Sequence, residues 1–215
     1  MSNFKTKYAL VGTGSRANMF IEPLVTKFRD DSELVALSDP NPSRLNFYNQ
    51  NLIEKHEYND VPTFHSDDFH KMILQTKPDV VIVTTIDAMH HKYIIEALEL
   101  GCDVITEKPM TIDAEKCAEI IQAIEKSGRK LRVAFNYRWA PGATKVKELL
   151  LKNTIGKLIH VDMEYWLNTS HGADYFRRWH REKDKSGGLI VHKSTHHFDL
   201  VNWWTNSVPE TVFGF

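Results

Sequence analysis

Cysteine is scarce in this sequence: Cys102 and Cys117 are the only two among 215 residues. Two cysteines cannot build a disulfide framework, and their spacing matches no zinc-binding pattern. This usage is typical of proteins that keep their thiols reduced, so we expect a cytoplasmic protein.

Long apolar runs are also lacking. The first seven residues are mainly polar, and the apolar run from Tyr8 to Val11 breaks at Gly12. That run is too short for the core of a signal peptide. No stretch approaches the roughly 20 apolar residues that a helix needs to cross a bilayer, so we expect no membrane partner.

An excess of charge of one sign is missing too. The chain has 27 basic and 28 acidic residues, which gives a formal net charge of -1. Such a chain has no overall field to attract nucleic acid, and we expect no nucleic-acid partner. Hydrophobic residues make up 42% and charged residues 26%, a composition that indicates a globular chain and excludes a disordered one.

What the chain does contain is an alternation of short apolar segments with longer amphipathic ones over residues 1–135. The clearest buried strand is DVVIVTT, residues 79–85. Further strands are predicted at 8–12, 33–39, 63–64, 103–107 and 130–135, and helices at 16–28, 42–51, 67–75 (capped by Asp67 or Asp68), 89–100 and 111–127. Strands alternating with helices of this length indicate an α/β fold with a doubly wound parallel sheet.

The pattern changes from residue 136 onward. Helices are predicted at 143–152 and 188–204, a long strand at 157–167, and a strand that is just starting at 211–215. We therefore expect two domains, one over residues 1–135 and the beginning of a second over residues 136–215.

Residues 12–17 read GTGSRA, directly after the first predicted strand and at the start of a helix. Gly12 permits the tight turn, Gly14 lets the backbone approach a pyrophosphate, and Ala17 is small enough for the helix to pack on the strand. The helix N-terminus then offers free N–H groups to the phosphates. A glycine turn without a ligand is the alternative for this motif alone, but the α/β context favours dinucleotide binding.

Asp39 ends the second predicted strand, about where a dinucleotide site has an acid that holds the ribose hydroxyls. Its surroundings, SDPNP, are also good turn chemistry, and both roles can hold together. A carboxylate here repels the 2′-phosphate of NADP, and the first basic residue after it is Arg44. NAD is therefore the favoured cofactor and NADP the less favoured one.

Several motifs in the same order resemble the glucose–fructose oxidoreductase, inositol dehydrogenase and MocA (Gfo/Idh/MocA) family. In chain order they are GTGSRA with Asp39, Thr84-Thr85 and His90, Glu107-Lys108-Pro109, Asn136-Tyr137-Arg138 with Pro141, and Gly187-Gly188 followed by HKSTHHFD at 192–199. The match covers essentially the whole chain, and Glu107-Lys108-Pro109 is its most diagnostic part.

The resemblance implies an N-terminal NAD(P)-binding Rossmann domain and a C-terminal α/β domain for substrate and oligomer contacts. Lys108 would then lie near the nicotinamide and the substrate hydroxyl, and His196 would complete the proton-transfer pair. The cofactor-binding residues that it implies or that the motifs indicate are Gly12, Thr13, Gly14, Ser15, Arg16, Asp39, Thr84, Thr85, His90, Glu107, Lys108 and Asn136. A homo-oligomer is implied if the second domain is complete.

The chain departs from the family pattern at three points. Thr85-Ile86 stands where the family often has Thr-Pro, and His192 with His196 replaces an Asp-x-Gly-x-x-His arrangement with one spacer residue fewer. Family members are also commonly much longer, so we expect the second domain to be truncated.

Lys108 is the predicted base. Hydride transfer from a secondary alcohol needs a group that takes the hydroxyl proton. Burial and a positive nicotinamide ring would lower the pKa of this lysine toward that task. An exposed lysine paired with Glu107 is the alternative.

The late histidines carry three competing interpretations. His192 and His196 are four residues apart and would share one face of a helix. We favour proton relay with substrate binding over a metal site, because no nearby glutamate completes a metalloprotease motif; a structural pair is the third interpretation. Asp199 is expected to support a histidine. A neutral His90 at a helix N-terminus is predicted to contact the cofactor, with capping as the alternative.

A polar, aromatic and basic stretch supplies further candidates for sugar contact. Aromatic faces stack on sugars, and arginines hold hydroxyls. The candidates are Tyr165, Trp166, Tyr175, Arg177, Arg178 and Trp179, and a core or solvated role is equally open for each.

The sequence thus predicts an NAD(P)-dependent dehydrogenase that transfers a hydride to or from a secondary alcohol of a sugar, inositol or related polyol. Two alternatives stay open. One is an NAD-dependent glycoside-cleaving enzyme that uses transient oxidation and elimination. The other is a non-catalytic NAD-binding sensor.

Overall fold

The chain divides into two compact units in the computed structural model, which describes residues 4–214 except for the side chains of residues 171 and 174. The first unit ends at Val133 and the second begins at Ala134. This division lies two residues before the boundary expected from the sequence.

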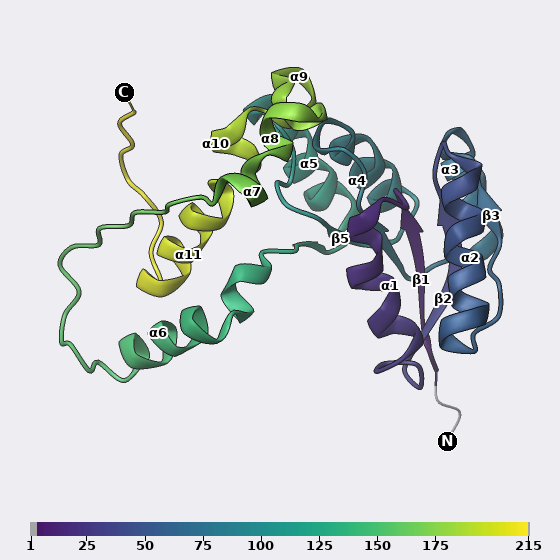
Figure 1. The fold of residues 1–215 in the computed structure, drawn as a ribbon, viewed down its shortest axis with the longest axis horizontal. Coiled ribbons are helices and arrows are strands. Elements are labelled where there is room, and N and C mark those ends of the chain that lie inside the picture. Colours follow the sequence, from purple (N-terminus) through teal and green to yellow (C-terminus); the bar gives the residue numbers. More distant parts are fainter. Residues whose placement is uncertain (1–3, 215) are drawn as a thin grey trace. The chain divides into compact units, whose positions relative to one another are not determined.

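A six-stranded sheet with the order β3-β2-β1-β4-β5-β6 forms the centre of the first unit (Figure 1). Every pair of neighbouring strands is parallel. The strands are β1 (Thr6–Val11), β2 (Ser32–Ser38), β3 (Thr63–Phe64), β4 (Val80–Val83), β5 (Asp103–Thr106) and β6 (Leu131–Val133). The predicted doubly wound α/β fold is confirmed, and the strand order reverses between β1 and β4, where such sheets bind their ligands.

Helices connect these strands. They are α1 (Asn18–Val25), α2 (Pro42–His56), α3 (Phe69–Thr76), α4 (His90–Glu99) and α5 (Ala114–Ser127), with short 3-10 turns η1 (Ser15–Ala17), η2 (Ser66–Asp68) and η3 (Asp87–Met89). Two separate apolar cores show that helices cover both faces of the sheet. Val81 and Val83 of β4 face the core with α3, α4 and α5, and Ile82 between them faces the core with α1 and α2. This burial on both faces explains the continuous apolar run in the sequence of β4.

One helix start differs from the prediction. Neither Asp67 nor Asp68 caps α3 through its side chain. A 3-10 turn precedes the helix, and the capping contact moves upstream to His65, whose Nδ1 accepts a hydrogen bond from the Asp67 N–H at 3.3 Å. The cap therefore serves the short turn and not the helix.

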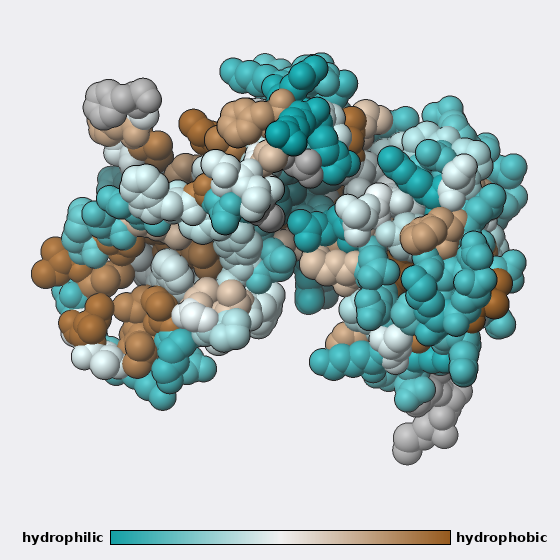
Figure 2. Space-filling model, in the orientation of Figure 1, coloured by the Kyte–Doolittle hydropathy of each residue, from teal (hydrophilic) through white to brown (hydrophobic). Residues whose placement is uncertain are grey.

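The second unit is helical in the part that the structure describes. Its elements are η4 (Asn136–Trp139), α6 (Pro141–Leu151), α7 (Thr169–Gly172), α8 (Asp174–Arg177), η5 (Trp179–Arg181), α9 (Lys183–Ser186), α10 (Leu189–His192) and α11 (Thr195–Thr205). Helices α6 and α11 pack together, and the Trp204 indole N–H donates to the Ala143 carbonyl at 3.0 Å. Hydrophobic side chains gather on the surface of this unit (Figure 2), among them Leu149 and Leu151 of α6.

Two predicted strands of this unit are wrong. Residues 157–167 form an extended segment without strand pairing (Figure 1), and residues 211–214 form no strand either; residue 215 lies outside the described residues. Apolar alternation places side chains, but a strand also needs a neighbour for its N–H and C=O groups. The second unit, in its described part, offers no such neighbour.

The predicted helix at 188–204 is interrupted. It divides into α10 and α11 around Lys193 and Ser194, although the backbone at Ser194 stays near helical values with φ -76° and ψ -10°. No helix of the described residues is long and apolar enough to cross a membrane.

Candidate functional site

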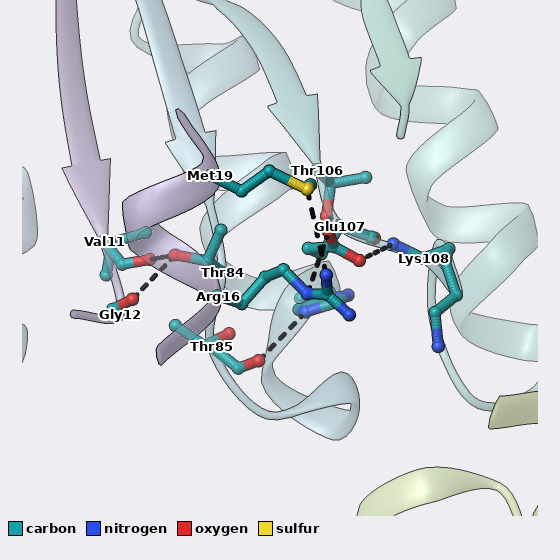
Figure 3. Close-up of polar contacts among 10 residues, drawn as sticks. Val11, Gly12, Arg16, Met19, Thr84, Thr85, Thr106, Glu107 and Lys108 are labelled. Carbon is teal, nitrogen blue, oxygen red and sulfur yellow. Dashed lines mark hydrogen bonds and ion pairs between the residues drawn. The ribbon is translucent and has the colours of Figure 1, made fainter. Parts of the chain in front are cut away.

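The turn after β1 lies directly against the backbone that follows β4. Gly12 has φ +94°, and a Cβ there would lie 2.6 Å from the Thr85 nitrogen and 2.7 Å from the Thr84 carbonyl carbon. Only glycine tolerates both this conformation and this approach. The Thr84 hydroxyl donates to the Gly12 carbonyl at 2.6 Å and fixes the two loops together (Figure 3).

Gly14 has a different surrounding. A Cβ at Gly14 would meet no atom within 4 Å, so the space above this backbone is open. The Tyr48 hydroxyl donates to the Gly14 carbonyl at 2.7 Å and holds the turn from the α2 side. An open, fixed backbone before the first turn of a helix suits the approach of a pyrophosphate.

Asp39 is almost completely buried at 2% exposure and organises this edge of the sheet. Its Oδ2 accepts a hydrogen bond from the Thr13 N–H at 2.7 Å, and its Oδ1 accepts one from the Asn41 N–H at 2.8 Å. Arg44 Nη1 lies 3.8 Å from Oδ2. A carboxylate oxygen can accept more than one hydrogen bond, so the predicted ribose contact stays a prediction.

Two buried hydroxyls near the same edge lack hydrogen-bond partners among the described residues. They are Thr13 Oγ1, in the turn after β1, and Ser38 Oγ, in the last residue of β2. Buried polar atoms are nearly always paired, so unpaired ones at the carboxyl ends of strands suggest a place that a polar ligand completes. The donors and the open backbone of this edge therefore fit a dinucleotide.

Glu107 and Lys108 follow β5 and are both 7% exposed. Arg16 Nε lies 3.4 Å from Glu107 Oε1, while Glu107 Oε2 accepts a hydrogen bond from the Lys108 backbone N–H at 3.1 Å. The Lys108 side chain extends away from Glu107 (Figure 3). The alternative of an exposed lysine paired with Glu107 is therefore wrong, because the lysine is buried and the ion pair of Glu107 is with Arg16.

Burial raises the pKa of the Glu107 carboxyl, and Arg16 and Lys108 only partly oppose this rise. Burial disfavours the ionised form of a carboxyl group unless cations lie close to it. Arg16 is therefore the counter-charge that lets Glu107 carry its negative charge beside the turn after β1.

His90 lies behind this site. Its ring is fully buried, with Nδ1 2.8 Å from the Pro109 carbonyl oxygen and Nε2 3.2 Å from the Thr85 carbonyl oxygen. Burial lowers the pKa of His90 and favours the neutral ring. The expected contact with the cofactor needs correction, because a buried ring has no surface to offer a ligand. His90 links the loop after β4 to the loop that carries Lys108.

The two candidate histidines of the second unit lie among different aromatic rings. His196 is stacked on Tyr137 with ring centroids 3.9 Å apart and an interplanar angle of 5°. His192 has its ring 5.4 Å from that of Tyr175 and 4.7 Å from that of His180. The two histidines belong to different helices, α10 and α11, and their joint role stays a prediction.

Asp199 has a different partner from the one expected. Its carboxylate accepts two hydrogen bonds from the Arg138 guanidinium, at 2.7 Å and 2.5 Å. This bidentate pair raises the pKa of Arg138. The expectation that Asp199 supports a histidine is wrong, because an arginine fork matches both carboxylate oxygens at once. The pair joins η4 to α11.

Other sequence candidates are spread over the second unit. Asn136 is exposed in η4, outside the unit that carries the other predicted cofactor residues, so its cofactor contact stays a prediction. Trp179 stacks on His180 at 3.9 Å, and Trp166 is 89% exposed. Arg177 and Arg178 are exposed. In the described part of the chain, no three His, Cys, Asp or Glu side chains gather in a way that could hold a metal ion.

Comparison with known proteins decides the family. A family model described as an oxidoreductase family with an NAD-binding Rossmann fold matches residues 6–135, and its C-terminal alpha/beta domain matches residues 147–215. The chain belongs to the Gfo/Idh/MocA oxidoreductase family. The resemblance that the motifs indicated is thereby confirmed.

Curated relatives place this family member among oxidoreductases. YteT of Bacillus subtilis (strain 168), which is named as an oxidoreductase, is 44% identical over 205 residues, covering 95% of this chain and 47% of YteT. D-glucoside 3-dehydrogenase of Escherichia coli (strain K12) is 30% identical over 158 residues, covering 74% of this chain and 42% of that protein. The chain spans about half the length of these relatives.

Solved structures of the family share the fold. The scyllo-inositol dehydrogenase from Lactobacillus casei, solved with bound cofactor NAD(H) and scyllo-inositol, aligns with a TM-score of 0.77 and 23% identity. The alignment covers 94% of this chain and 57% of that one. At this identity the likeness concerns the fold.

Sequence reasoning missed one buried cation of this Gfo/Idh/MocA protein. Lys193, between the two candidate histidines, is only 7% exposed. A lysine in a polar motif gives no sign of burial, because most lysines are solvated. The burial of Lys193 becomes visible only in the structure, where aromatic rings surround it.

Proposed function

We propose that this family member transfers a hydride between a nicotinamide cofactor, NAD in preference to NADP, and a secondary alcohol of a sugar, inositol or related polyol. The observation that carries the proposal is the edge formed by Gly12, Gly14 and Thr13. Gly12 leaves no room for a Cβ, Gly14 has open space above it, and Thr13 has a buried hydroxyl without a partner among the described residues.

The chain's residues have distinct tasks in binding the cofactor. The backbone of residues 12–16 faces the pyrophosphate, because the first turn of a helix offers unpaired N–H groups. Asp39 accepts hydrogen bonds from the ribose hydroxyls and disfavours a 2′-phosphate through its charge. Thr84 and Thr85 hold the loop after β4 against the turn. When bound, NAD supplies the hydride acceptor or donor.

The proton is handled by Lys108 and His196 in this proposal. Lys108 Nζ takes the proton of the substrate hydroxyl as the hydride leaves, or returns it in the reverse direction. His196 passes the proton onward to solvent, and His192 assists substrate binding. The stack of His196 on Tyr137 keeps the imidazole in one orientation for this task.

The substrate class is supported by the relatives' names, which include a D-glucoside dehydrogenase and inositol dehydrogenases. A cytoplasmic location and a homo-oligomer formed through the second domain belong to the same proposal. The exposed apolar side chains of the second unit support such an assembly.

Cofactor titration followed by a substrate screen tests the proposal. NADH fluorescence should change saturably on adding the 215-residue chain, and NAD should be reduced in the presence of at least one sugar or inositol. A chain that does not bind NADH would disprove the proposal. A chain that binds NADH but reduces NAD with no polyol, while a version with a longer second domain does, would show that the second domain is too short here for catalysis.

A further inference from the structure

Lys193 is a buried cation surrounded by tyrosine hydroxyls. Its Nζ donates to the Tyr137 hydroxyl at 2.7 Å and lies 5.6 Å from the centre of the Tyr165 ring. Burial raises the pKa of the nearby Tyr175 hydroxyl, and Lys193 opposes that rise. No Asp or Glu forms an ion pair with Lys193 among the side chains that the structure describes. A buried ammonium group is costly without a negative partner, and the described side chains around Lys193 supply no negative charge.

The neighbours of Lys193 are hydroxyl and imidazole groups, which can donate hydrogen bonds as well as accept them. Tyr137 is the largest cause of a raised pKa of the neighbouring Tyr165 hydroxyl. His197 packs against Tyr165 with ring centroids 4.4 Å apart, and its buried Nε2 has no hydrogen-bond partner among the described residues. Tyr165 is 50% exposed, which gives the group an open side.

We propose that Lys193, together with the hydroxyls of Tyr137, Tyr165 and Tyr175, binds a carboxylate carried by the sugar substrate. This inference rests on the proposed function and narrows its substrate class to acidic sugars. One positive charge among neutral O–H donors matches the single negative charge of a carboxylate. A phosphate carries more charge and calls for more cations, and a metal ion would be repelled by Lys193.

Tyr137 connects this anion site to the proposed proton-handling residue. Its hydroxyl is hydrogen-bonded to Lys193, while its ring is stacked on His196. A carboxylate held at Lys193 would therefore fix the sugar beside His196 within the second unit. The same contact explains why a lysine stands between the two histidines of the motif.

Matched sugar pairs test the proposal by direct calorimetric binding, without turnover. The probes are methyl β-D-glucuronide with methyl β-D-glucoside, and methyl α-D-galacturonide with methyl α-D-galactoside, each titrated with and without NADH. At least one uronide should bind about tenfold or more tightly than its neutral twin, the gain expected from hydrogen bonds to a charged group. Lys193→Met should remove that preference, whereas Lys152→Met, which changes an exposed lysine of the same unit, should keep it.

Folding of the variants is checked by near-UV circular dichroism, and Tyr137→Phe provides a second probe because it keeps the ring on His196 and removes only the hydroxyl. Tyr137→Phe should reduce the preference about three- to tenfold. Uronides that bind no better than their neutral twins, or do not bind at all, would overturn the inference. Tighter binding of glucose 6-phosphate would overturn the assignment to a carboxylate. Absent NADH binding would reject the proposed function alone and leave the sugar titrations valid.

Discussion

Arg16 and Glu107 form an ion pair, with Nε and Oε1 3.4 Å apart, that connects the turn after β1 to the loop after β5. Arg16 is half exposed in the first turn before α1, where a pyrophosphate is proposed to lie. Glu107 accepts a hydrogen bond from the backbone N–H of Lys108. The Glu107 carboxylate therefore contacts both the Arg16 guanidinium, which is proposed to lie near the pyrophosphate, and the backbone of Lys108, the proposed base.

Replacement of Glu107 tests this arrangement through pH. A carboxyl whose pKa is higher in the folded chain than in the unfolded chain binds its proton more tightly when folded. The contribution of Glu107 to the free energy of unfolding is therefore complete below its ordinary pKa of 4.5. It is lost as the pH rises through the raised pKa of the folded chain. Glu107→Gln should therefore stabilise the chain at pH 7, by about 2 to 4 °C in melting temperature for each kcal/mol gained.

The difference between Glu107→Gln and the unmodified chain should shrink as the pH falls through the raised pKa of Glu107, and the shrinkage should be complete below about 4.5. Thermal unfolding at several pH values measures it, with Glu125→Gln as the control for an exposed glutamate of the same unit. A destabilised Glu107→Gln at neutral pH would mean that the ion pair with Arg16 outweighs the cost of burial.

His90 predicts a pH dependence of the opposite sign. Burial is the largest cause of its lowered pKa, Asp87 opposes it and Lys108 adds to it. A histidine that is neutral in the fold contributes stability above its ordinary pKa of 6.5, and that contribution is lost as the pH falls through the lowered value. Stability should decline between pH 7 and pH 5, and His90→Gln should flatten the decline.

Urea unfolding at the two pH values measures this effect, and His70→Gln, at an exposed histidine of the same unit, should leave the decline unchanged. His90→Gln should also lower kcat more than it weakens NADH binding, because the ring holds the loops of Thr85 and Pro109 and does not meet the ligand. Equal slopes for His90→Gln and the unmodified chain would contradict the neutral, buried state.

The first unit was largely predictable because its signals are local. The apolar run of β4 and the glycine turn at Gly12 each require one structure, since a parallel sheet buries whole strands and a backbone contact excludes a Cβ. The second unit was not predictable in this way. Residues 157–167 alternate like a strand but have no neighbouring strand among the described residues. Asp199 binds Arg138, which is 61 residues away in the sequence. Burial of Lys193 likewise depends on rings brought together by the fold.

Arg44 tests the preference between the two cofactors. Its Nη1 lies 3.8 Å from Asp39 Oδ2, and its side chain is 54% exposed. The carboxylate repels a 2′-phosphate, while the guanidinium partly compensates. NADH should bind more tightly than NADPH, and Arg44→Ala should weaken NADPH about tenfold while changing NADH by about twofold or less. Fluorescence titration of both cofactors measures these affinities. An equal loss of affinity for NADH and NADPH would show that Arg44 does not contact the 2′-phosphate.

Lys108 is the residue on which the proposed chemistry depends most. If it takes the substrate proton, Lys108→Met should lower kcat by about 10² to 10⁴, the usual contribution of a general base. NADH affinity should change little, because the variant keeps the hydrogen bond from the backbone N–H of residue 108 to the Glu107 carboxylate. Lys126→Met, at an exposed lysine in α5 of the same unit, should retain full activity. Turnover by Lys108→Met close to that of the unmodified chain would assign Lys108 a purely structural role.

The same assay separates proton relay from metal chemistry at the histidines. A histidine that passes a proton to solvent must first be neutral to accept it, so activity should rise with pH if His196 has this role. His196→Ala should flatten that rise, and His192→Ala should affect the KM more than kcat because His192 is proposed to assist substrate binding. A strong chelator should change nothing. Activity that disappears with the chelator and returns with zinc would contradict the relay, since a proton passed between imidazoles needs no metal, and it would make His192 and His196 ligands.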